Sequence, residues 1–335
     1  MNRADGGLAG SGGRRAGSLP FALMGFCVLL SVGLCDAARA EDVLVEPVQV
    51  LRDLDRDIDL PEQKIPQLEA QFTRVLAAAD KVTLDKLPDN DLLAFYEAAY
   101  RVAFYSMEAP YARQMQRALD ELERRHLATA RIRQQMLDRY VGARMLDEAQ
   151  AFATDPANAG VERLPVIRDA SSPGHTPTLW QVEGQGASLV RRDFALGDKA
   201  QLVVVGSPWC PFSDRASEAI LGDVEMSSLM ANHSTWIMPQ SSMPDLAVVE
   251  KWNQAHVGWP MRLAYLESEW PLIPAWDTPG FYFIKDGKLV SAVNGWPGPE
   301  QMDKLRSGFA SIGIRLRKEN QPLPVNTATP TGSHP

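Results

Sequence analysis

The sequence predicts an N-terminal region of antiparallel helical hairpins followed by a region of α+β or α/β class. Apolar residues recur at helical spacing from about Leu60 to Phe152, which indicates amphipathic helices. Beyond residue 176 the apolar segments become short and β-branched, with helical stretches between them. The stretch of small and polar residues from Asp155 to Gly160 separates the two patterns, as a linker does.

The amino-acid composition excludes several classes of protein. Of the 335 residues, 45% are hydrophobic and 23% charged, with 24 Gly and 24 Pro, which excludes collagen-like, disordered and multi-spanning membrane proteins. The length predicts about two domains. The chain has 34 Lys and Arg against 42 Asp and Glu, a net charge of −8, without a concentrated basic run. Nucleic acid is therefore not an expected partner.

The first forty residues are typical of an export signal. Arg14-Arg15 precedes a 15-residue apolar run, residues 21–35, which is shorter than a comfortable membrane span, and Ala38-Arg39-Ala40 supplies a small-x-small cleavage pattern. We expect residues 1–40 to be a signal peptide cleaved after Ala40 and the mature protein to be periplasmic. In the alternative, the segment stays uncleaved as an anchor and is the only membrane contact.

Residues 41–158 are predicted to form an all-α domain, either a bundle or an irregular array of helical hairpins. Oxygens in Pro88–Asp91 are predicted to cap the second helix, Pro110 suits the first turn of the third, and Gly142 ends the fourth. The predicted apolar faces are Leu68, Phe72, Val75, Leu76 and Ala79; Leu92, Tyr96, Ala99, Tyr100 and Ala103; Met115, Leu119 and Leu122; Ile132, Met136 and Tyr140; and Met145, Leu146, Ala149 and Phe152. The aromatic cluster Phe95, Tyr96, Tyr100, Phe104 and Tyr105 is expected in the core rather than in a ligand groove.

Strands and helices alternate after the linker. The predicted elements are a hairpin of 179–182 and 188–194, a buried strand at 201–205, a helix containing Ala216–Leu221, a strand at 235–238, a helix at 244–256, a hairpin of 281–284 and 289–293 around Asp286-Gly287, and a last helix at 302–312. Residues 257–277 are expected as an aromatic-rich loop over the active face. Residues 317–335 are polar and rich in Pro and Thr, as disordered tails are.

One motif carries reactive chemistry. Strand 201–205 leads into Trp209-Cys210-Pro211-Phe212-Ser213 and then into a helix, which places Cys210 at the helix N-terminus. Free backbone amides and the helix dipole stabilise a thiolate there and lower its pKa from the ordinary value of about 8.5. Pro211 suits the first helical turn. We expect Trp209 and Phe212 to shield the sulfur and Ser213 to hydrogen-bond it.

Residues 176–314 resemble the thioredoxin superfamily in three respects: this motif, Thr278-Pro279 before a hairpin, and the order of the elements. The resemblance implies that residues 159–316 form a domain with a central mixed sheet flanked by helices. It implies that Cys210 is the nucleophile and that Thr278 and a cis Pro279 face it as a docking edge. Trp209, Pro211 and Phe212 would then contact the substrate beside Cys210.

Two departures from that family limit the chemistry. Ser213 stands where dithiol members carry the resolving cysteine, and Val204 stands where thioredoxins keep a buried acid. After loss of Cys27 and Cys35 with the signal, Cys210 is the only cysteine. The chain therefore cannot run a dithiol cycle by itself. Cys-Pro-Phe-Ser also resembles the motif of single-cysteine glutaredoxins.

The sequence leaves two functions open. In the first, Cys210 exchanges disulfides or forms mixed disulfides with cysteine-containing envelope proteins, with a second thiol as reductant and the helical domain positioning or dimerising the protein. In the second, a non-catalytic thioredoxin-like module binds partners in an envelope assembly, and Cys210 is an inert thiol. Neither function requires a cofactor, and no metal-ligand spacing occurs in the sequence.

Overall fold

The computed structural model describes residues 43–184, 186–197 and 199–314. The expected signal peptide 1–40, its cleavage site after Ala40 and the expected disordered tail 317–335 lie outside the described residues. Residues 43–314 belong to one compact unit. Within the described part of the chain, no helix is long and apolar enough to span a membrane.

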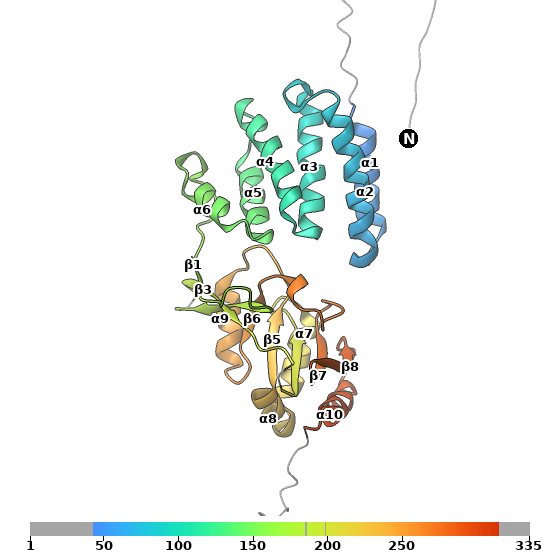
Figure 1. The fold of residues 1–335 in the computed structure, drawn as a ribbon, viewed down its shortest axis with the longest axis vertical. Coiled ribbons are helices and arrows are strands. Elements are labelled where there is room, and N and C mark those ends of the chain that lie inside the picture. The colour runs from blue at the N-terminus through green and yellow to red at the C-terminus, as the bar shows by residue number, and fades with distance from the viewer. Residues whose placement is uncertain (1–42, 185, 198, 315–335) are drawn as a thin grey trace, which may run out of the picture. The chain divides into compact units, whose positions relative to one another are not determined.

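The N-terminal part is helical, as predicted, and its helices lie side by side in Figure 1. They are α1 (Val45–Asp57), α2 (Pro61–Asp80), α3 (Asp89–Ser106), α4 (Ala109–Arg124), α5 (Ala130–Gly142) and α6 (Leu146–Thr154), with short 3-10 turns at Leu84–Lys86 and Pro156–Asn158. Pro110 lies in the first turn of α4 and Gly142 ends α5, as the sequence predicts. We call α1–α6 the helical region.

Two expectations for the helical region were wrong. Helix α1 precedes the predicted start of the helical pattern near Leu60, and it buries Val48 and Leu51. The acidic side chains at the start of α3 do not cap that helix. Asp91 instead accepts hydrogen bonds from the amides of Val43 at 2.9 Å and Leu44 at 3.2 Å, because its carboxylate faces the neighbouring start of α1.

The predicted aromatic cluster lies only partly in the core. Phe95 and Tyr96 are buried, and the Phe95 ring packs 5.8 Å from that of Phe72. Phe104 is 42% exposed, although its ring contacts those of Tyr100 and Tyr105. The end of α3 therefore presents an aromatic side chain outside the core.

An eight-stranded mixed sheet with strand order β1-β3-β2-β6-β5-β4-β7-β8 forms the second part. Its strands are β1 (Val166–Asp169), β2 (Thr178–Glu183), β3 (Ser188–Asp193), β4 (Gln201–Val205), β5 (Ser234–Met238), β6 (Met261–Ala264), β7 (Gly280–Lys285) and β8 (Lys288–Asn294). The helices are α7 (Pro211–Leu221), α8 (Val224–His233), α9 (Leu246–Ala255) and α10 (Gln301–Ser311), with a 3-10 turn at Glu267–Glu269. We call residues 166–314 the sheet region.

The predicted element order is present around β4. Strand β4 pairs in parallel with β5 and antiparallel with β7, and β7 pairs antiparallel with β8. Asp286 and Gly287 join β7 to β8 with positive φ at both residues, as the expected hairpin turn requires. The central mixed sheet flanked by helices is confirmed, and β4 carries the chain to Cys210.

Side chains of β4 alternate between two apolar layers. Leu202 and Val204 join the cluster that contains Ile220 of α7 and Phe309 of α10. Val203 and Val205 face the opposite layer with Trp270. Since both faces are covered, residues 202–205 of β4 are all apolar rather than alternating with polar residues.

Part of the segment expected as a loop over the active face belongs to the sheet. Residues 257–277 contain strand β6, which pairs with β5 and β2. Trp259 and Trp270 are buried, and Trp270 fills the second apolar layer. The short apolar run Met261–Ala264 was too brief to separate from the surrounding aromatic residues by pattern alone.

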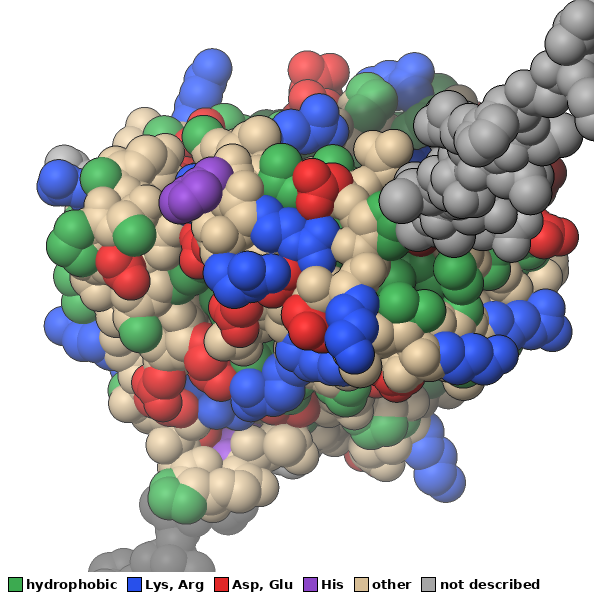
Figure 2. Space-filling view, turned by 90° about the horizontal axis from the view of Figure 1, so that it is seen from above, with side chains coloured by type: hydrophobic (Ala, Val, Ile, Leu, Met, Phe, Trp, Pro, Cys, Tyr) green, Lys and Arg blue, Asp and Glu red, His purple; other side chains and the backbone are tan. Residues whose placement is uncertain are grey.

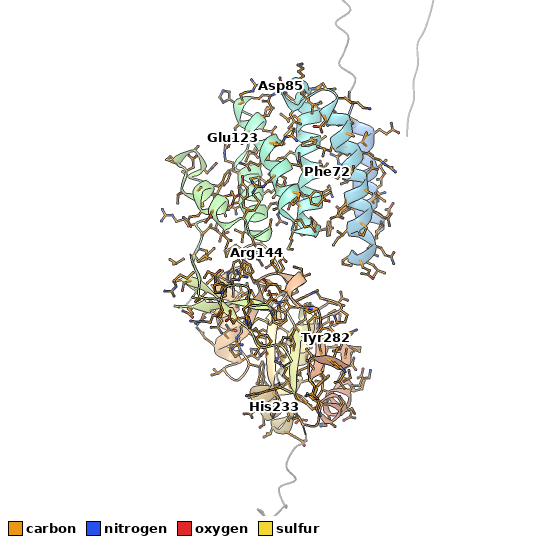
Figure 3. All side chains as sticks on the ribbon, in the orientation of Figure 1. Phe72, Asp85, Glu123, Arg144, His233 and Tyr282 are labelled. Carbon is orange, nitrogen blue, oxygen red and sulfur yellow. The ribbon has the colours of Figure 1, made fainter. Side chains whose placement is uncertain are left out.

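Arg144, after α5, joins the helical region to the sheet region (Figure 3). Its guanidinium donates to the carbonyl oxygens of Tyr265 at 2.6 Å, Ser241 at 2.9 Å and Ala264 at 3.2 Å. It also lies 4.2 Å from the ring centroid of Trp180. Burial lowers the pKa of Arg144 to about 10, so the group stays charged at neutral pH.

The surface mixes charges of both signs. On the face that Figure 2 shows, Lys and Arg side chains lie among Asp and Glu side chains. Ion pairs also link helices α1 and α3, where Arg101 pairs with Asp55 and Arg52 pairs with Glu97. The described part of this face is therefore unlike the uniform basic surface that phosphate backbones require.

Candidate thiol site

Cys210 lies where β4 passes through a short turn into α7. The turn is closed by a hydrogen bond from the Cys210 amide to the Ser207 carbonyl at 3.0 Å, and the Asp214 amide donates to the Cys210 carbonyl at 3.1 Å. Cys210 has extended backbone geometry and is the N-cap residue of α7, with Pro211 in the first turn. The first amides of α7 therefore lack intrahelical acceptors and lie beside the sulfur.

Several groups determine the protonation of the thiol. Burial raises the pKa of Cys210, but hydrogen bonds from Thr278, from the amide and hydroxyl of Ser213, and from the amide of Phe212 lower it. Sγ also lies 3.2 Å from the carbonyl oxygen of Thr278, to which the thiol donates. That contact favours the thiol, whereas the donors favour the thiolate. The donors prevail, and the pKa lies below its ordinary value.

Ser213 reaches the sulfur from inside the helix. Its side chain is fully buried, and its hydroxyl oxygen accepts from the Ser207 amide at 3.3 Å. The hydroxyl proton is thereby left available for Sγ. Ser213 therefore acts as a hydrogen-bond donor to the sulfur.

The other motif residues are placed at the surface. Trp209 is 48% exposed and Phe212 is 45% exposed, and Pro211 is also exposed. The guanidinium of Arg215 lies 4.5 Å from the centroid of the Phe212 ring. Trp209 and Phe212 therefore flank the cysteine without burying it, and Cys210 itself is partly exposed.

Thr278-Pro279 lies against Cys210 although 68 residues separate Thr278 from it. The Thr278–Pro279 peptide bond is cis, as is Thr176–Pro177. Pro279 is buried at the start of β7, and its carbonyl oxygen accepts from the Gly295 amide at 2.8 Å. The fold thus brings Cys210, Ser213 and Thr278 into contact, while Pro211 and Phe212 lie on the outer side of the turn.

A cavity that the sequence did not predict opens beside this site. It has a volume of about 700 Å³, and both Trp209 and Thr278 line it. The helical region contributes Arg139, and the sheet region contributes Trp276. We call it the Arg139 cavity. A basic residue on the apolar face of α5, between Met136 and Tyr140, was the available sequence signal.

The Cys210 sulfur is the nucleophile that the site offers when it is ionised. Among residues 43–314, apart from 185 and 198, no group of His, Cys, Asp and Glu side chains is placed to hold a metal ion. Val204, six residues before Cys210, is fully buried in the sheet.

Comparisons with known proteins give little further information. No protein-family model matches the chain, and no curated protein matches it. Among solved structures, a thioredoxin-like protein from Bacteroides caccae is similar, with 11% identity, 78% of this chain and 92% of that chain covered, and a TM-score of 0.26. Because this TM-score is low, we base the functional proposal on the strand order and on the contacts of Cys210.

Proposed function

We propose that this protein is an exported thiol–disulfide exchange protein whose Cys210 forms mixed disulfides with cysteine-containing envelope proteins. The observation that carries the proposal is the position of the sulfur: partly exposed at the N-terminus of α7, with the thiol pKa below its ordinary value. Export rests on the sequence of residues 1–40 alone.

The proposed step needs one thiolate. Cys210 loses its proton to solvent, and the thiolate attacks one sulfur of a partner's disulfide. A bond forms between Sγ and that sulfur, the partner's S–S bond breaks, and the second sulfur leaves as a thiolate that takes up a proton. Cys210 is oxidised to the mixed disulfide while the leaving sulfur is reduced. Since Ser213 is not a thiol, an external thiol must then release the partner.

The pH dependence of alkylation tests the proposal. In the full chain carrying Cys27→Ser and Cys35→Ser, Cys210 is the only thiol, and its rate of reaction with iodoacetamide reports the thiolate fraction. We expect an apparent pKa below about 8.5. An apparent pKa at or above that value would contradict an activated nucleophile and favour the non-catalytic binding module.

A cellular experiment separates the two functions. Cys210→Ser should abolish the disulfide-linked complexes of this protein on non-reducing gels of envelope extracts. It should also abolish the protein's role in the cell, seen as the phenotype of a deletion strain. If Cys210→Ala and Cys210→Ser both leave the role intact while the protein stays folded, Cys210 is dispensable and the exchange proposal fails.

A further inference from the structure

The Arg139 cavity adjoins the thiol site. Trp209 precedes Cys210 in the chain, and the Thr278 carbonyl contacts Sγ; both residues line the cavity. Met243 and Trp276 add apolar surface to its walls. A volume of about 700 Å³ suits a small organic ligand. A ligand held there would contact Trp209 and Thr278, the two lining residues that adjoin Cys210.

Arg139 is a buried cation without a carboxylate partner among the described residues. Its side chain is only 4% exposed, and Nε and Nη1 have no hydrogen-bond partner there. Nη2 donates to the hydroxyl of Ser242, which lines the same cavity. Burial lowers the pKa of Arg139, which shows the cost of keeping this charge away from water.

Aromatic rings cover the rest of the guanidinium. Its central carbon lies 4.9 Å from the Phe104 ring centroid and 5.5 Å from that of Tyr100. Phe104 also lines the cavity and is 42% exposed. A carboxylate in the cavity would supply the acceptor that Nε and Nη1 lack among the described residues, and hydrogen bonds between arginine and a carboxylate are among the strong ones.

The solvent-exposed part of the cavity wall carries negative charge, opposite to that of the Arg139 guanidinium. Asp245 and Asp277 line the cavity and are exposed, and the Asp245 carboxylate also accepts from the Ala247 amide at 2.9 Å. A carboxylate on a ligand would meet Arg139 at the inner end, and an amino group would meet an aspartate at the exposed end. Amino-acid-like compounds combine these groups.

We propose that the Arg139 cavity binds a low-molecular-weight thiol that carries a carboxylate, and that this thiol resolves the mixed disulfide on Cys210. The inference rests on the proposed function, which requires an external thiol because Ser213 cannot serve. It adds to the proposed function the chemical class of the external thiol, and it names Arg139 as the residue that selects this thiol.

The resolving step balances without another reactant. The thiolate of the small compound attacks the Cys210 sulfur of the mixed disulfide, a bond forms between the two sulfurs, and the partner protein leaves as a thiol after protonation. A second molecule of the compound then attacks the sulfur that the first molecule contributed to the new mixed disulfide. This second attack yields the symmetrical disulfide and the free Cys210 thiolate.

Three symmetrical disulfides of different charge test the inference. They are 3,3′-dithiodipropionate (anionic), 2-hydroxyethyl disulfide (neutral) and cystamine (cationic), each reacted with the Cys27→Ser, Cys35→Ser chain and followed by mass spectrometry. General electrostatics of a chain with net charge −8 favours the cation. We expect the anionic reagent to label Cys210 about tenfold faster than the neutral one, from its pairing with Arg139.

Variants assign the preference to one residue. Arg139→Gln should make the anionic reagent no faster than the neutral one, and Arg139→Lys should restore part of the anionic advantage. Arg131→Gln removes an exposed positive charge from the same helix and should leave the order of rates unchanged. Equal rates for the anionic and neutral reagents in the protein with Arg139 intact, or an anionic preference that survives Arg139→Gln, would overturn the inference.

A binding measurement separates this inference from the proposed function. In the Cys210→Ser protein no exchange occurs, yet 3,3′-dithiodipropionate should quench tryptophan fluorescence saturably, because Trp209 and Trp276 line the cavity. Saturable quenching that requires Arg139 supports the cavity even if Cys210 proves inert. Absence of quenching, with a low Cys210 pKa intact, rejects the cavity and leaves the exchange function standing.

Discussion

At the scale of single residues, the hydroxyl of Ser213 sets the chemistry of Cys210. A second thiol at this position would close a disulfide with Cys210 and expel a bound partner. A buried hydroxyl cannot do so, but it donates to the sulfur and lowers the thiol pKa. In the proposed function, Ser213 thus favours attack by the Cys210 thiolate, and release of the mixed disulfide is left to another thiol.

Ser213→Ala tests this role. Loss of the hydroxyl donor destabilises the thiolate, so we expect the apparent pKa of Cys210 to rise by about one unit, in line with one hydrogen bond to a charged group. The pH dependence of iodoacetamide alkylation measures the shift. Ser217→Ala is the matched control, since that buried hydroxyl on α7 donates to the Asp214 carbonyl at 2.8 Å and not to the sulfur. Equal pKa values in both variants would refute the role of Ser213.

The contacts of the site that could be predicted from sequence are those between residues close together in the chain. Cys210 and Ser213 follow a buried strand and start a helix, so the motif predicts their contact from helical geometry. Thr278 was reached only through the family resemblance. Arg139 and Trp276 line one cavity because the helical region packs against the sheet region, and no local pattern encodes that packing.

At the scale of elements, long periodic segments were predicted and short or highly charged ones were not. Strand β1 and strand β6 have four residues each, too few for a periodic pattern, and only sheet pairing defines them. Helix α1 has a narrow apolar face among charged residues. Polar contacts hold it: the hydroxyl of Tyr105 and the ammonium of Lys64 both donate to Asp55.

Asp91 is predicted to anchor the start of α1. Asp91→Ala leaves the buried Leu44 amide without its acceptor, and such a loss costs about 1–3 kcal/mol. We expect the free energy of unfolding in urea to fall by that amount and hydrogen-exchange protection at Val48 and Leu51 to drop. Asp91→Asn keeps one acceptor oxygen and should cost less. Asp59→Ala, at an exposed position, is the control; a similar result for it and Asp91→Ala would exclude the anchoring role.

At the scale of the whole molecule, the candidate site depends on the junction between the helical region and the sheet region. Arg144 and Gln240 provide two of the polar links there: Gln240 Nε2 donates to the Gly142 carbonyl at 2.8 Å. Arg139 of α5 provides another through Ser242. The helical region therefore contributes Arg139 to the cavity beside Cys210, whereas Asp245 and Asp277 come from the sheet region.

Glu267 makes this junction sensitive to pH. Its Oε1 accepts from the Gln240 amide at 3.0 Å, and its own amide donates to Gln240 Oε1 at 3.1 Å. Burial raises the pKa of Glu267 from 4.5 to about 7, against the lowering effects of the Gln240 amide and of Arg144. Between these two pH values the folded protein binds the proton that the unfolded chain has lost. Stability from this group is therefore complete below pH 4.5 and declines as the pH rises to about 7.

Glu267→Gln removes this titration while keeping the size of the side chain. We expect the wild-type protein to lose at most about 3 kcal/mol from this group between pH 4.5 and 7, since one unit of pKa shift corresponds to about 1.4 kcal/mol. The variant should lack that decline and should be the more stable protein above pH 7. Urea unfolding at pH 5 and pH 7.5 measures the difference, with Glu218→Gln, an exposed carboxylate on α7, as control. If the two variants show the same pH dependence, Glu267 is ionised in the folded protein and the junction does not sense pH through it.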